Sequence, residues 1–219
     1  MLEAKLVHAQ QADSKRLMVV LHGLGDSMAG YFWMPQVLRL QWLNYLLVNA
    51  PDPYYGGYSW YDIVMTGPAS SDHAASEPGV RRSIQLLSGL LDAQRDLGFA
   101  TQQTILCGFS QGCLMTLETG LRYPHRFAGL IGLSGYVLDP QRLLSELAPV
   151  AKEQRLLVTH GRRDPLIPFA DVKRQVEVLK AGGLQIEWHE MNKPHTIIEE
   201  EIELIRGFTE KCFQDANGQ

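Results

Sequence analysis

Seven short apolar runs alternate with longer amphipathic segments along the 219 residues, and this alternation constrains the fold more than any other feature. Several of the runs are rich in Val, Ile and Leu and lack polar alternation, as in strands that are buried on both faces. They cover residues 5–9, 16–21, 45–48, 104–109, 128–133, 155–159 and 184–189. Such a series of strand candidates predicts a sheet at the centre of the protein.

The segments between these runs have helical periodicity. They cover residues 83–97, 111–123, 141–147, 169–179 and 196–213. The last begins with Thr196 and Glu199, which have the spacing of a capping box. Strands that alternate with helices predict an α/β fold with a mostly parallel sheet and helices on both faces. No repeat or linker divides the sequence, so we expect a single domain over residues 1–219.

Charge and cysteine usage exclude several functional classes. The net charge is −4 with no basic run of five residues, which argues against binding to nucleic acid. Cys107, Cys113 and Cys212 are widely spaced and form no CxxC pair, so we expect no disulfide framework, no metal site and no cofactor. The apolar run 17–21 is too short for a signal peptide, and the stretch 127–138 is too short to span a membrane. These features predict a cytoplasmic protein without integral membrane association.

A glycine-flanked serine lies between a predicted buried strand and a predicted helix. The sequence Gly108-Phe109-Ser110-Gln111-Gly112 matches GxSxG, and its position at a strand-to-helix turn is that of a nucleophile elbow. Such a turn needs glycines because strand and helix approach each other closely there. It would place the Ser110 hydroxyl above the carboxyl edge of the sheet, where we expect it to act as a nucleophile.

A second glycine-rich loop, His22-Gly23-Leu24-Gly25-Asp26, follows the strand candidate at 16–21. Acyl transfer places negative charge on the former carbonyl oxygen, which two main-chain N–H groups must stabilise. In a nucleophile-elbow arrangement one N–H comes from the residue after the serine, here Gln111, and the other from such a loop. We therefore predict an oxyanion hole made by Leu24 and Gln111.

A serine nucleophile needs a base and an orienting carboxylate, which should follow it in the order acid, then histidine. Asp164 lies just beyond the strand candidate at 155–159, and Asp139 is the alternative acid. His195 lies between the last strand and the last helix, so we expect it to be the base. The histidines at strand ends, His22 and His160, are expected to form supporting hydrogen bonds instead.

The chain resembles the phospholipase/carboxylesterase family of α/β-hydrolases, which includes carboxylesterases and acyl-protein thioesterases. The resemblance depends on HGLGD at 22–26, NAP at 49–51, WYDI at 60–63, GFSQG at 108–112, HGRRDPLIP at 160–168 and His195 before the last helix. It implies an α/β-hydrolase fold without a cap domain, often assembled as a homodimer, that acts on a small-molecule ester or thioester. It also implies a triad of Ser110, Asp164 and His195 with oxyanion donors at Leu24 and Gln111.

Two positions depart from the family pattern. Cys113 follows GFSQG where the family usually has a further glycine, and Asn192-Lys193-Pro194 precedes the base where a Gly- or Met-containing run is more usual. Both departures concern the substrate range, because neither removes a catalytic group.

Three functions are compatible with these residues. The first is a serine carboxylesterase for small to medium acyl esters, and the second is an acyl-protein thioesterase or lysophospholipase for long acyl chains. The third is a catalytically silent fold used for binding, although such a chain would be expected to have lost a triad member or an elbow glycine. An acyl chain needs an apolar groove beside Ser110, and we expect Trp33, Met34 and Trp60 to line it.

Overall fold

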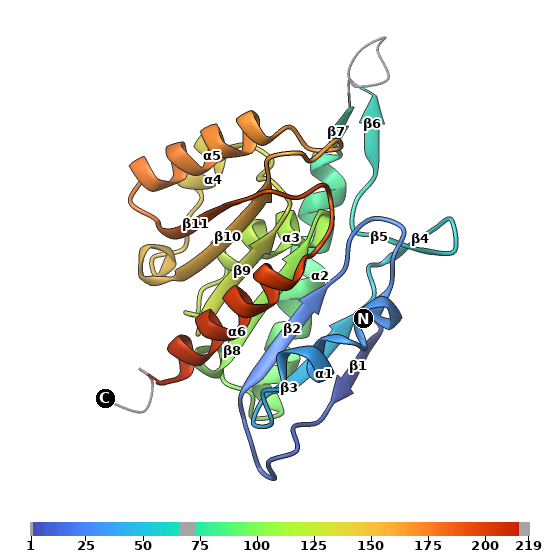
Figure 1. The fold of residues 1–219 in the computed structure, drawn as a ribbon, viewed down its shortest axis with the longest axis vertical. Coiled ribbons are helices and arrows are strands. Elements are labelled where there is room, and N and C mark those ends of the chain that lie inside the picture. Colours follow the sequence, from blue (N-terminus) through green and yellow to red (C-terminus); the bar gives the residue numbers. More distant parts are fainter. Residues whose placement is uncertain (1, 66–72, 215–219) are drawn as a thin grey trace.

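The predicted strands form one seven-stranded sheet in the computed structural model, which describes residues 2–65 and 73–214 (Figure 1). The order is β1-β3-β2-β8-β9-β10-β11, with β1 antiparallel to β3 and the other neighbours parallel. The strands are β1 (Ala4–Val7), β2 (Leu17–Leu21), β3 (Asn44–Val48), β8 (Thr104–Phe109), β9 (Gly129–Leu133), β10 (Arg155–Gly161) and β11 (Gln185–Met191). The mostly parallel sheet confirms the fold class predicted from the sequence.

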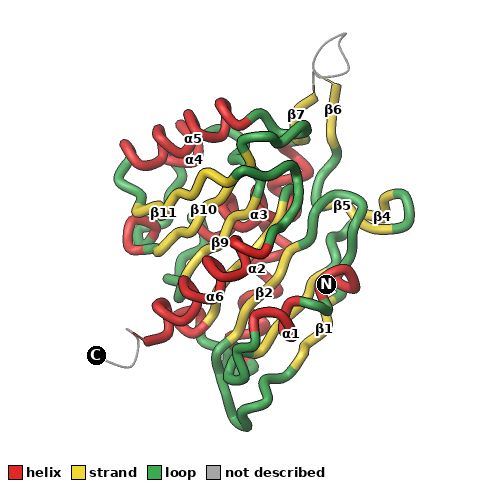
Figure 2. The backbone as a smooth tube through the Cα atoms, in the orientation of Figure 1, coloured by secondary structure: helices red, strands yellow, loops and turns green. Residues whose placement is uncertain are grey.

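Helices cover both faces of the sheet, as Figure 2 shows in red. Buried side chains of α2, α3, α4 and α5 pack on one face, and those of α1 and α6 pack on the other. The helices are α1 (Met34–Leu38), α2 (Glu77–Asp96), α3 (Gln111–Gly120), α4 (Pro140–Ser145), α5 (Phe169–Ala181) and α6 (Glu199–Gln214), with 3-10 turns at Met28–Tyr31, Thr101–Gln103 and Ala151–Glu153. The fully buried strands β2, β3 and β9 are apolar at nearly every position because both of their faces are covered.

Two helix starts differ from the sequence prediction. Helix α2 begins at Glu77, six residues before the predicted start, because Ser76 caps it and Pro78 is tolerated in the first turn. Helix α6 begins at Glu199, and within the part of the chain that the structure describes no hydrogen bond joins Thr196 to Glu199; the Thr196 hydroxyl donates to the Ile197 carbonyl at 3.4 Å. Instead, the Glu201 carboxylate accepts a hydrogen bond from the Ile198 main-chain N–H at 3.2 Å.

The segment 51–78, which lies between the predicted strand 45–48 and the predicted helix 83–97, contains two antiparallel hairpins, although residues 66–72 lie outside the described residues. They pair β4 (Asp52–Tyr54) with β5 (Gly57–Ser59), and β6 (Ile63–Met65) with β7 (His73–Ala75). The first hairpin joins the glycine-rich loop after β2, since Tyr58 exchanges main-chain hydrogen bonds of 2.9 Å with Gly25 and Asp26.

Parallel pairing brings the carboxyl ends of β2, β8, β9, β10 and β11 to one edge of the sheet (Figure 1). The loops that follow β2, β8, β10 and β11 carry Leu24, Ser110, Asp164 and His195, respectively. Polar groups at such an edge converge on one region in open α/β sheets. Within the described residues, no helix has the length and apolar character that crossing a membrane requires.

Candidate active site

Ser110 lies on a strained turn between β8 and α3. Its φ angle is +56°, in the region that side chains rarely adopt. The flanking glycines are required sterically, because a methyl group at Gly108 would overlap the Gly112 carbonyl and one at Gly112 would overlap the Leu21 carbonyl. The turn is fixed to the neighbouring strand by the Ser110 N–H, which donates to the Leu133 carbonyl at 2.9 Å. This geometry is the elbow that the GxSxG pattern predicted.

The structure brings Ser110, His195 and Asp164 into one hydrogen-bonded chain. His195 Nε2 lies 2.9 Å from Ser110 Oγ, and His195 Nδ1 lies 2.7 Å from Asp164 Oδ2. Because a carboxylate only accepts hydrogen bonds, Nδ1 carries the proton and Nε2 accepts from the serine hydroxyl. The imidazole is thus oriented to remove a proton from Ser110.

Asp164 is held as a carboxylate by the loop that carries it. Its Oδ1 accepts hydrogen bonds from the main-chain N–H groups of Leu166 at 2.9 Å and Ile167 at 3.0 Å. Burial alone would raise the pKa of Asp164, but the bonds from His195 and from these two N–H groups outweigh it and lower the pKa below its usual value. The acid therefore stays ionised beside the imidazole.

The alternative acid, Asp139, lies elsewhere and is not part of this arrangement. It is exposed and caps α4, accepting from the N–H groups of Gln141 at 2.9 Å and Arg142 at 3.1 Å. An aspartate that opens a helix after a strand has the same local sequence signature as a catalytic acid, so only the tertiary structure distinguishes the two.

The loop after β2 lies against the nucleophile turn. A methyl group at Gly23 would lie 3.3 Å from Ser110 Cβ, so the loop backbone approaches the serine closely. In the part of the chain that the structure describes, the N–H groups of Leu24 and Gln111 have no hydrogen-bond partner. Two unpaired N–H groups flanking a serine have the composition of an oxyanion hole.

The neutral imidazole of His22 fixes the position of this loop through two hydrogen bonds to the main chain. Its Nδ1 donates to the Gly23 carbonyl at 2.6 Å, and its Nε2 accepts from the Ala50 N–H at 3.0 Å. Burial lowers the pKa of His22, although the bond to the Gly23 carbonyl opposes this effect. The supporting role expected for this histidine is therefore present in the structure.

The side chain of Gln111 also ties the nucleophile turn to residues 59–61. Its Oε1 accepts from the Trp60 N–H at 3.0 Å, and its Nε2 donates to the Tyr61 carbonyl at 3.0 Å. The Trp60 indole N–H donates in turn to the His22 carbonyl at 2.9 Å. The sequence did not predict these hydrogen bonds, because their partners are about 40 to 50 positions apart and no local pattern links them.

The expected acyl-groove residues have different positions. Trp60 and Met34 are 0% and 1% exposed, which corrects the expectation that they line an open groove; both belong to the packed interior. Trp33 is only partly buried and packs against Tyr31. Among the large apolar side chains that are exposed, Phe32 at 43% lies in the connection between β2 and α1, and Leu166 at 71% lies in the loop of Asp164.

Cys113, the departure from the family pattern, fits because two glycines face it. A methyl group at Gly132 would lie 2.8 Å from Cys113 Sγ, and one at Gly135 would lie 2.7 Å from the same sulfur. The thiol is fully buried, and burial raises its pKa to about 12. The side chain therefore fills the space between the nucleophile turn and these glycines, and its thiol is unreactive.

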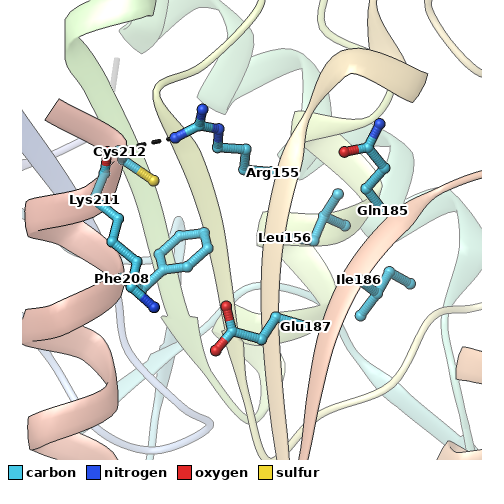
Figure 3. A pocket seen from close by; sticks show the side chains of 8 residues that line it. All are labelled: Arg155, Leu156, Gln185, Ile186, Glu187, Phe208, Lys211 and Cys212. Carbon is cyan, nitrogen blue, oxygen red and sulfur yellow. Dashed lines mark hydrogen bonds between the residues drawn. The ribbon is translucent and has the colours of Figure 1, made fainter. Parts of the chain in front are cut away.

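A pocket of about 410 Å³ lies at the opposite edge of the sheet, between α6 and the amino ends of β10 and β11 (Figure 3). The described residues that line it are Arg155, Leu156, Gln185, Ile186, Glu187, Phe208, Lys211 and Cys212. None of these belongs to the Ser110 arrangement. Among the described residues, no group of three His, Cys, Asp or Glu side chains could hold a metal ion.

The sequence model of the phospholipase/carboxylesterase family matches residues 2–213. The chain belongs to this family. It is 35% identical to acyl-protein thioesterase 1 of Schizosaccharomyces pombe over 157 residues, which cover 68% of this chain and 69% of the relative. It is 28% identical to acyl-protein thioesterase 1 of Yarrowia lipolytica over 210 residues, or 90% and 92% of the two chains.

The fold is also similar to that of a solved esterase structure. The crystal structure of esterase PE8 superposes with a TM-score of 0.86 at 26% identity and covers 96% of this chain and 99% of that chain. These comparisons confirm the resemblance predicted from the sequence. As a member of the phospholipase/carboxylesterase family, the protein is a serine hydrolase with an α/β-hydrolase fold.

Proposed function

We propose that the protein is a serine carboxylesterase that hydrolyses small to medium acyl esters through Ser110, His195 and Asp164. The observation that carries this proposal is the hydrogen-bonded chain from Asp164 Oδ2 to Ser110 Oγ, with distances of 2.7 and 2.9 Å on the two sides of the imidazole. Its order along the polypeptide, serine, aspartate and then histidine, is that of α/β-hydrolases.

In the proposed reaction, His195 Nε2 takes the Ser110 hydroxyl proton while Oγ attacks the acyl carbonyl carbon. The resulting oxyanion accepts hydrogen bonds from the N–H groups of Leu24 and Gln111. When the carbon–oxygen bond to the alcohol breaks, the imidazolium gives its proton to the departing oxygen and an acyl-enzyme remains. Water, deprotonated by His195, then attacks the acyl-enzyme and releases the acid and free Ser110.

The preference for shorter acyl chains is supported by the burial of the residues that were expected to line a groove. Two of the three expected groove residues are packed in the interior, which leaves exposed side chains such as Phe32 and Leu166 for contact with an acyl chain. Each methylene group that becomes fully buried contributes about 0.8 kcal/mol, so specificity should rise until the apolar surface ends. We expect kcat/KM to peak at roughly four to eight acyl carbons on this basis.

An acyl-protein thioesterase is the second candidate, because the two fungal relatives described above carry that name. Hydrolysis of p-nitrophenyl esters from two to sixteen carbons, beside matched acyl thioesters, separates the two functions. A maximum at medium chain length on the oxygen esters supports the carboxylesterase. A kcat/KM that climbs to sixteen carbons, or that is higher on the thioesters throughout, supports the thioesterase or lysophospholipase.

A further inference from the structure

A fully buried ion pair joins the loop that carries His195 to helix α6. The Lys193 ammonium is 2.6 Å from Glu201 Oε2, and neither side chain has exposed surface. Lysine and glutamate are among the residues least often buried. Removing both charges from water is costly, and a buried pair of this kind contributes little net stability compared with apolar side chains of the same size. Its presence therefore calls for an explanation other than stability.

Each hydrogen-bonding group of the pair has a partner. Besides Glu201, the ammonium donates to Ser134 Oγ and to the Thr196 carbonyl, both at 2.7 Å. The other carboxylate oxygen, Glu201 Oε1, accepts from Thr159 Oγ1 at 2.5 Å. A network satisfied in this way fixes the positions of its members, because any displacement leaves a buried charge unpaired.

The partners of Lys193 belong to the loops that carry the triad. Thr196 directly follows His195, and Ser134 follows Leu133, whose carbonyl holds the Ser110 N–H. The Lys193 main chain completes the connection, since its carbonyl accepts from the Arg163 N–H at 3.2 Å, next to Asp164. A methyl group at Gly161 would overlap that carbonyl, so the loops of acid and base are in direct contact.

We propose that Lys193 is a positioning residue that holds the His195 loop in register with the loops of Ser110 and Asp164. The proposal rests on the function proposed above. Lys193 does not touch the reacting atoms; it acts through the Thr196 carbonyl and Ser134, and Glu201 neutralises its charge. The asparagine-lysine-proline run that departs from the family pattern before the base thus has a role in the geometry of the triad.

Three variants test this role: Lys193→Met, the double variant Lys193→Met with Glu201→Gln, and Lys173→Met. The double variant removes both charges, while the amide introduced at position 201 can still bond to Thr159 and to the Ile198 N–H. Lys173 is the matched control, since it pairs with Glu190 at 3.0 Å but is 46% exposed. For each protein, kcat and KM for p-nitrophenyl butyrate and the Tm are measured.

We expect Lys193→Met to lower kcat by about 10²-fold with KM changed by less than about threefold, because the base is displaced while the acyl site is intact. The unpaired Glu201 should also lower Tm by about 10 °C. The double variant should recover most of the Tm and keep the low kcat, and Lys173→Met should match the wild type in both.

Recovery of wild-type kcat together with Tm in the double variant would overturn the proposal, because Lys193 would then serve stability alone. Normal kcat in Lys193→Met, or a loss confined to KM, would overturn it as well. If Lys193→Met does not fold, the kcat of the double variant decides. A wild-type protein without esterase activity would refute the proposed function instead, so the two failures are distinguishable.

Discussion

The indole N–H of Trp60 donates a hydrogen bond of 2.9 Å to the main-chain carbonyl of His22, and both side chains are buried. This bond connects the loop after β5 to the residue that opens the glycine-rich loop. The main-chain N–H of Trp60 also donates to Gln111 Oε1. Trp60 thus connects Gln111 to the loop of Leu24, the two residues proposed to supply the oxyanion hole. Trp60 is therefore a support of the oxyanion loop, whereas the sequence predicted that it contacts the acyl chain.

Replacing Trp60 with phenylalanine should lower kcat about tenfold for every ester, since the lost donor leaves the buried His22 carbonyl unpaired and loosens the oxyanion loop. The ratios of kcat/KM among acetate, butyrate and octanoate esters should stay within about twofold of the wild type. Trp33→Ala is the contrasting variant: we expect it to flatten the chain-length profile and to spare acetate. A Trp60→Phe enzyme that loses only its longer substrates would show that the sequence prediction was right.

The steric fit between Cys113 and Gly132 predicts a reciprocal rescue. Gly132→Ala alone should lower Tm by several degrees, because the new methyl group would lie 2.8 Å from Cys113 Sγ and its next neighbour is at 3.7 Å. Combining it with Cys113→Ala removes the sulfur and should restore most of the Tm. Thermal unfolding of the two single variants and the double variant gives the coupling, and strictly additive effects would refute this fit.

Asp164→Asn should lower kcat by about 10²- to 10⁴-fold, since an amide in place of the carboxylate favours the wrong imidazole tautomer. Asp139→Asn is a matched control from the alternative acid. Asparagine caps helices as well as aspartate does, so this variant should keep both kcat and Tm. A larger loss of kcat in Asp139→Asn than in Asp164→Asn would contradict the geometry.

Stability should depend on pH through the buried neutral histidines His22 and His160. Burial lowers the pKa of both below the usual 6.5, although the hydrogen bonds that the two imidazoles donate to the Gly23 and Ile167 carbonyls oppose this shift. The unfolded chain therefore binds more protons below pH 6.5, and the free energy of unfolding should fall as the pH drops from 6.5 toward the folded-state pKa values. Each group contributes a slope of at most about 1.4 kcal/mol per pH unit.

Urea unfolding at pH 5, 6, 7 and 8 measures this dependence. His22→Gln should be less stable than the wild type at pH 7 but should show a shallower slope between pH 5 and 6.5, because one of the two buried histidines is gone. An unchanged slope would mean that His22 does not remain neutral in the folded protein.

The centre of the sheet could be predicted from the sequence because β2, β8 and β9 are nearly continuous apolar runs. Segment 51–78 could not, since strands such as β4 and β5 have three residues each and depend on Tyr58 bonding to Gly25 and Asp26. The same limit applies to the capping box of Thr196 and Glu199: the spacing was right, but the buried Glu201 carboxylate takes the place of the local cap.

At the site, the positions of Ser110, Asp164 and His195 followed from one motif and the order of strands, because parallel topology brings the strand ends together. Burial of side chains within loops did not follow. From the sequence alone, Trp60 in the long segment 51–78 is expected to be exposed and to contact substrate. Lys193, in a turn, is expected to be solvated. Only partners more than 30 positions away in sequence, such as His22 and Ser134, reverse these interpretations.

The most direct test of the proposed mechanism is mass spectrometry of the protein after reaction with a fluorophosphonate, which modifies a serine activated by a neighbouring base. We expect one adduct on the peptide that contains Ser110, much slower labelling in His195→Ala, and none in Ser110→Ala. Labelling or ester hydrolysis that survives undiminished in Ser110→Ala would contradict the assignment of Ser110 as the nucleophile.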